Sequence, residues 1–155
     1  MELEKEIITA RCMEYLVELD PNLTLLQVIN RCGFSYCNDS VMTGKVKIPI
    51  LENKGLPCLR PMACLNFGHG LNSLEVSIRM KTLGLKPATK MEGFFFAYQN
   101  QKVYRKNPLI VLGDDDDLVL CLSFEDSMAG YVFEVKKMDP ESKYLKHCLF
   151  LAVLE

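Results

Sequence analysis

Three segments of this 155-residue chain are apolar without the alternation of a half-buried strand, and they constrain the fold most. They are residues 94–96, 118–122 and 148–154. A strand that is apolar on both faces needs cover on both faces, so a sheet packed on one side only cannot hold all three. Either other parts of the chain or a partner protein must supply the second cover. Phe95 and Phe150 are therefore candidate members of an interaction surface.

The spacing of apolar residues changes near residue 44. Within residues 3–19 they recur every three or four positions, which predicts an amphipathic helix. A second helix is predicted over residues 25–32, because Thr24 and Gln27 form a capping box and Gly33 suits a left-handed cap. The two helices would form a hairpin. It would be acidic, since residues 1–44 hold three basic side chains and seven acidic ones.

Beyond residue 44 the apolar pattern favours strands, which we expect at residues 45–50, 74–80, 93–98, 109–112, 118–124, 131–135 and 143–154. Residues 52–72 contain too many Pro and Gly residues for an assignment. The interpretation is one α+β, mainly β domain over residues 1–155. Its helical N-terminal lobe, residues 1–44, would pack on an antiparallel β-sandwich or barrel formed by residues 45–155. A β-grasp-like sheet is the alternative, and it requires a helix at residues 71–83.

Charge argues against nucleic acid as a partner. Lys and Arg total 18 against 20 Asp and Glu, and the longest basic runs are only the pairs Arg105-Lys106 and Lys136-Lys137. A duplex binder needs a clustered basic surface. Residues 25–35 resemble the second helix and turn of a helix-turn-helix, which keeps a nucleic-acid binder as an alternative. The next residues, 36–44, offer it no Arg or Lys.

Seven cysteines, with charged residues throughout positions 1–20 instead of a secretory signal, indicate reduced thiols and a cytoplasmic protein. We expect no metal or other cofactor, because the cysteine spacings are mostly wider than those of zinc knuckles. If that expectation fails, the best ligand or reactive-thiol set is Cys37, Cys58, Cys64 and His69. This set defines a further alternative, a small Cys/His-dependent enzyme or zinc protein.

Four adjacent carboxylates, Asp114, Asp115, Asp116 and Asp117, lie between two apolar segments. They predict a solvated turn and are candidate members of the interaction surface, as a docking point for a basic partner. A cation site formed by their carboxylates is the alternative. No common catalytic motif occurs, and no apolar stretch reaches the roughly 18 residues of a membrane span. The expected function is a non-enzymatic intracellular protein–protein interaction or regulatory module. Its partner would be another protein or a second copy, so an accessory or effector protein that forms a homodimer fits this description.

Overall fold

The computed structural model describes residues 10–36, 39–42, 48, 51, 55–113 and 117–154. Seven strands form one sheet in the order β1-β2-β7-β4-β5-β6, with β3 also paired to β7. The strands are β1 (Arg11–Leu19), β2 (Cys58–Asn66), β3 (Leu85–Pro87), β4 (Leu109–Val111), β5 (Leu118–Glu125), β6 (Gly130–Lys137) and β7 (Leu149–Leu154). The helices are α2 (Leu25–Cys32), α3 (Asp39–Met42), α4 (Ser73–Thr82) and α5 (Lys90–Gln99), with the 3-10 turns η1 (Gln101–Tyr104) and η2 (Asp126–Met128).

The sheet is open and mainly antiparallel. Among the paired strands of the described residues, only β4 and β7 run parallel, and β1 and β6 form the two ends of the strand order. The predicted class, α+β and mainly β, is therefore confirmed. The described strands form neither a sandwich nor a barrel, because the second apolar layer is supplied by helices instead of a second sheet.

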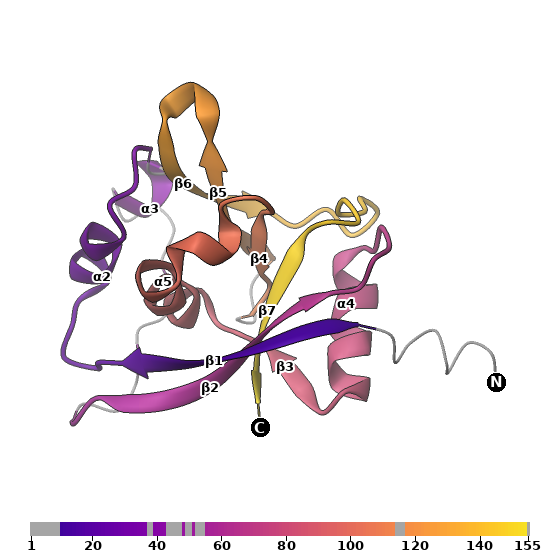
Figure 1. Ribbon diagram of the computed structural model, residues 1–155, viewed down its shortest axis with the longest axis horizontal. Helices are drawn as coiled ribbons and strands as arrows, with labels where there is room; N and C mark the ends of the chain where they lie inside the picture. Colours follow the sequence, from indigo (N-terminus) through magenta and orange to yellow (C-terminus); the bar gives the residue numbers. More distant parts are fainter. Residues whose placement is uncertain are drawn as a thin grey trace.

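Helices cover both faces of the sheet (Figure 1). α2 and α5 pack on one face, whereas α4 packs on the other. The alternating side chains of β7 divide between these layers: Leu151 and Val153 join the α2–α5 side, and Phe150 and Ala152 join the α4 side. The continuous apolar run of β7 is thus covered from within the chain.

The N-terminal helix predicted over residues 3–19 is wrong for residues 11–19, which form β1, and residues 1–9 lie outside the described part. β1 pairs with β2 along its full length, from Arg11 opposite Asn66 to Leu19 opposite Cys58. As a consequence Val17 is fully buried, whereas Leu16 is 66% exposed. Helix propensity is a weak preference that this long pairing overrides, so no N-terminal helical hairpin includes these residues.

The second predicted helix, α2, is confirmed with its caps. The backbone N–H of Gln27 donates to the Thr24 hydroxyl at 3.2 Å, and the backbone N–H of Thr24 donates to the Gln27 side chain at 2.8 Å. Gly33 ends the helix in the left-handed region, with φ at 64°.

Two segments predicted as strands are helices. Residues 74–80 belong to α4 and residues 93–98 to α5. In α4 the alternating apolar residues lie on opposite sides of the helix, so Val76 and Met80 are buried while Leu74 and Ile78 are exposed. Each helix begins with a capping box, at Asn72 and Glu75 for α4 and at Thr89 and Glu92 for α5. These boxes stabilise the first turn of each helix.

The three successive phenylalanines of α5 are all fully buried, because this helix is enclosed by the sheet, α2 and its own C-terminal turn. Phe94 packs against Phe133 with ring centroids 5.1 Å apart, and Phe96 packs against Tyr15 at 5.3 Å. Gly93 brings the helix close to the sheet. A Cβ there would lie 2.9 Å from a methyl carbon of Val111.

The remaining strands agree with the sequence prediction only in part. β4, β5 and β6 match the strands expected at residues 109–112, 118–124 and 131–135. The last strand starts at Leu149 instead of residue 143, and β2 occupies part of the segment left unassigned. The strand expected at residues 45–50 lies outside the described residues except for Ile48. The helix that the β-grasp alternative required is present as α4, although one helix does not by itself establish a β-grasp sheet.

Replacement of Phe150 by alanine should lower the free energy of unfolding by about 3–5 kcal/mol, as for other buried aromatic residues. Phe150 is 2% exposed and lies beneath α4. Leu74→Ala on the exposed side of α4 is the matched control and should change stability by less than about 0.5 kcal/mol. Urea unfolding followed by circular dichroism measures both. A folded, stable F150A protein would contradict the burial of β7.

Candidate functional site

A groove of about 680 Å³ lies on the same face of the sheet as α4, over strands β4, β5 and β6. We call it the β5–β6 groove. Its floor consists of the side chains of β4, β5 and β6 that point away from α5, namely Ile110, Val119, Cys121, Ser123 and Val132. The registers place these residues next to one another, since Cys121 lies opposite both Ile110 on β4 and Glu134 on β6. The floor is therefore mostly apolar.

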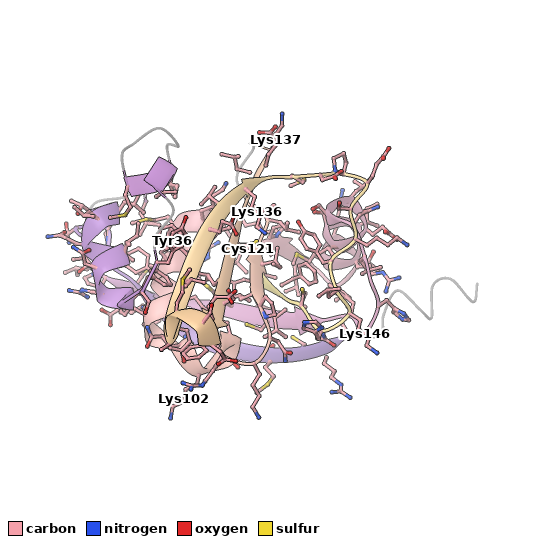
Figure 2. All side chains as sticks on the ribbon, turned by 90° about the horizontal axis from the view of Figure 1, so that it is seen from above. Tyr36, Lys102, Cys121, Lys136, Lys137 and Lys146 are labelled. Carbon is pink, nitrogen blue, oxygen red and sulfur yellow. The ribbon has the colours of Figure 1, made fainter. Side chains whose placement is uncertain are left out.

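One wall of the groove is the loop of residues 138–148, which connects β6 to β7 and carries Lys146 (Figure 2). Several hydrogen bonds hold this loop. The backbone N–H of Tyr144 donates to the Leu71 carbonyl at 2.8 Å. The side-chain hydroxyl of Tyr144 lies 2.9 Å from the Ser73 hydroxyl. The side-chain amide of Asn66 donates to the Lys146 and Cys148 carbonyls at 3.0 and 3.2 Å. The groove is thus pre-formed.

Cations from distant parts of the sequence meet at this groove. Both basic pairs that the sequence shows, Arg105-Lys106 and Lys136-Lys137, line it together with Lys143. The carboxylates in the lining are Glu125, Glu134 and Asp139. Five cations less three carboxylates leave a local charge of +2, in a chain whose formal charge is −2. The groove is therefore a locally positive surface on an acidic protein.

Cys121 lies in the groove beside Lys136, between β6 and the 138–148 loop (Figure 2). Burial raises the pKa of the Cys121 thiol to about 11, while the Lys136 ammonium opposes this increase and the Glu134 carboxylate adds to it. Burial also raises the pKa of Cys148 in the adjoining wall. Both thiols are therefore protonated at neutral pH, and a protonated thiol is a poor nucleophile.

A second hollow, of about 590 Å³, contains Cys64 and is lined also by Tyr15, Lys146 and His147. Its histidine is thus His147, whereas the sequence suggested His69 as the neighbour of Cys64. Burial raises the pKa of the Cys64 thiol to about 12. The hollow therefore brings a thiol and an imidazole into one region but leaves the thiol protonated.

The proposed Cys37, Cys58, Cys64 and His69 set is not assembled in the part that the structure describes. Cys58 and Cys64 lie six residues apart on β2, which at the rise of an extended strand separates them by about 20 Å. No group of three metal-ligating side chains occurs among the described residues. Cys37 lies outside them. Cys58 and Cys64 therefore cannot share one metal ion.

The other candidate residues have different positions. Phe95 and Phe150 are buried within the chain, at 0% and 2% exposure, so they present no surface in this structure. Asp117 is exposed at the start of β5, and its carboxylate lies 3.7 Å from the Lys137 ammonium. Asp114, Asp115 and Asp116 lie outside the described residues.

The segment after α2 does not form the recognition helix of a helix-turn-helix where the structure describes it. Phe34 packs onto Phe133 with centroids 4.9 Å apart, and Tyr36 forms a parallel bridge to Val132 on β6. α3, which follows, has four residues, Asp39–Met42. A single turn is too short to lie along a major groove and present several side chains to base edges.

Comparison with protein-family models, with characterised proteins and with solved structures gives no significant match to this chain. None of the helices in the described residues has both the length and the apolar character needed to cross a bilayer.

The basic groove was visible in the sequence only as two separate pairs of cations. No local sequence pattern shows that residues 105–106 and 136–137 lie at the same groove. Residues 105–106 follow η1, which packs on β5, and residues 136–137 end β6, which pairs with β5. The two pairs meet only because both elements contact β5. No sequence motif marked Tyr144 or His147 as residues that line these two hollows. The floor had no local signal either, because residues 118–122 are apolar without alternation.

Alkylation of Cys121 by iodoacetamide should accelerate about tenfold per pH unit between pH 7 and pH 9, because the thiolate fraction rises with pH throughout this range when the pKa is about 11. Peptide mapping by mass spectrometry measures the rate. The same cysteine in urea-unfolded protein is the control, and its rate should level off above the ordinary thiol pKa of about 8.5. If the alkylation rate of Cys121 in the folded protein levels off below pH 9, burial does not raise the pKa of this thiol.

Proposed function

We propose that this protein is a non-enzymatic protein-binding module and that the β5–β6 groove is its contact surface. The observation that carries the proposal is the incomplete cover of the sheet. The core on the α4 side extends from β2, β3 and β7 to Ile110 and Val119, but Cys121 and Ser123 of β5 are only half-buried in the groove. Pre-formed apolar concavities with a few polar groups are the usual form of binding sites.

The dimensions and the rigidity of the groove support binding. Its volume of about 680 Å³ lies within the roughly 300–1,000 Å³ of ligand sites. The Tyr144 and Asn66 hydrogen bonds fix the wall in advance. A wall that is already ordered costs less conformational entropy on binding.

The chemistry of the thiols supports binding over catalysis. Burial raises the pKa of Cys64, Cys121 and Cys148, so none of these side chains is prepared as a nucleophile at neutral pH. Cys58, Cys64, Cys121 and Cys148 are free thiols, which suits a protein of a reducing, cytoplasmic compartment. The partner is another protein or a second copy of this chain.

Substitution of Ser123 by arginine, at the floor of the groove, tests the proposal. A peptide selected from a phage-displayed library on the purified protein should bind the wild type and bind S123R at least about tenfold more weakly, because the long side chain fills the groove. Ser77→Arg is the matched control, since Ser77 is equally half-buried but lies on α4 outside the groove. Fluorescence anisotropy measures binding. If no peptide is enriched, or if S123R binds as tightly as wild type, the groove is not a protein-binding surface.

A further inference from the structure

We infer that the groove recognises an extended acidic peptide segment of its partner, in which carboxylate side chains alternate with apolar ones. This inference rests on the proposed function and specifies its ligand. It is argued from charge complementarity, because an otherwise acidic chain gathers Arg105, Lys106, Lys136, Lys137 and Lys143 around one groove.

These cations are available to a ligand. Lys136 lies 3.5 Å from Glu134, and Lys137 lies 3.7 Å from Asp117, but all four side chains are more than half exposed. Exposed pairs of this kind contribute little stability, about 0–1 kcal/mol, and exchange partners readily. Within the described residues Lys106 and Lys143 have no carboxylate within ion-pair distance.

Arg105 is oriented without being neutralised. Its guanidinium lies 4.2 Å from the centre of the Phe124 ring, which faces it as a cation–π partner. Such a contact orders the side chain and leaves its full charge for a carboxylate. Arg105 therefore provides an oriented donor in the groove lining.

The floor sets the second requirement of the ligand. The apolar lining that stays accessible is formed by Cys121, Met138, Tyr144 and Leu145, whereas Ile110, Val119 and Val132 are at most 8% exposed. An extended chain presents successive side chains to opposite faces. An acidic segment with alternating apolar residues can therefore pack its apolar side chains against this accessible part of the lining while its carboxylates reach the cations.

The carboxylates in the lining favour a peptide over nucleic acid. Glu125, Glu134 and Asp139 share the groove with the cations. A nucleic-acid backbone carries a charge at every phosphate and cannot avoid these carboxylates, and its affinity depends on the number of phosphates neutralised. A peptide can place its few carboxylates only where Lys136, Lys143 and Arg105 lie.

Defined octapeptides labelled with fluorescein test the inference by anisotropy at low salt. The probes are Glu-Val-Glu-Ser-Glu-Val-Glu-Ser, the same sequence with Gln in place of Glu, the same with Lys in place of Glu, and a single-stranded RNA octamer. The acidic peptide should bind most tightly, and its affinity should fall as salt is raised because surface charges are screened. The double variant Lys136→Glu and Lys143→Glu should lose about tenfold or more in affinity.

Lys81→Glu with Lys86→Glu is the matched control, since both lysines are exposed and neither lines the groove. It should bind the acidic peptide as the wild type does. Lys136→Gln with Lys143→Gln should show a smaller loss than charge reversal. Urea unfolding verifies that each variant is folded.

The outcomes separate this inference from the proposed function. Tighter binding of the Gln or Lys peptide, abolished by Ser123→Arg, overturns the acidic ligand but leaves the groove as a protein-binding surface. Tighter binding of the RNA overturns both. Binding of the acidic peptide that is unaffected by reversal of Lys136 and Lys143 also overturns the inference, because the contact would then lie elsewhere.

Discussion

Burial of β7 on both of its faces is the constraint on which the rest of the structure depends. Its two edges pair with β2 on one side and with β3 and β4 on the other. Its faces contribute Leu151 and Val153 to one core and Phe150 and Ala152 to the other. A strand in this position needs a helical layer above and below. α5 with α2 supplies one layer, and α4 supplies the other.

The proposed contact surface lies over β4, β5 and β6, beside this doubly covered strand. The α5 side of β5 and β6 is packed through residues such as Leu122 and Phe133. On the opposite side Val119 belongs to the core beneath α4, whereas Cys121 and Ser123 are half-buried and line the groove beside the 138–148 loop. The edges of the sheet are also partly protected. The side-chain amide of Gln99 bonds both the backbone N–H and carbonyl of Glu18 on β1, and Ser35 and Tyr36 bond to β6. These contacts limit pairing at the edges and leave the groove as the more open surface.

The sequence allowed α2 and the strands β4, β5 and β6 to be predicted, because each has a local signal that the tertiary structure does not oppose. α4 and α5 were missed although Asn72 with Glu75 and Thr89 with Glu92 follow the capping pattern. Two-residue periodicity in α4 and three successive aromatic residues in α5 outweighed those caps. β1 was misread because its pairing with β2 is a long-range interaction. In the β5–β6 groove, the sequence showed the cations only as two isolated basic pairs. Their proximity in the folded protein depends on the order of strands in the sheet, which no local pattern specifies.

Native-state hydrogen exchange of the backbone amides tests the central position of β7 most directly. The amides of residues 150–153 should exchange only through global unfolding, with a free energy of exchange equal to the free energy of unfolding. Amides of Val135 and Lys137, near the exposed end of β6, should exchange faster. If the β7 amides exchange faster than those of β6, then β7 is not the doubly covered centre of the sheet, and the placement of the groove beside such a strand fails.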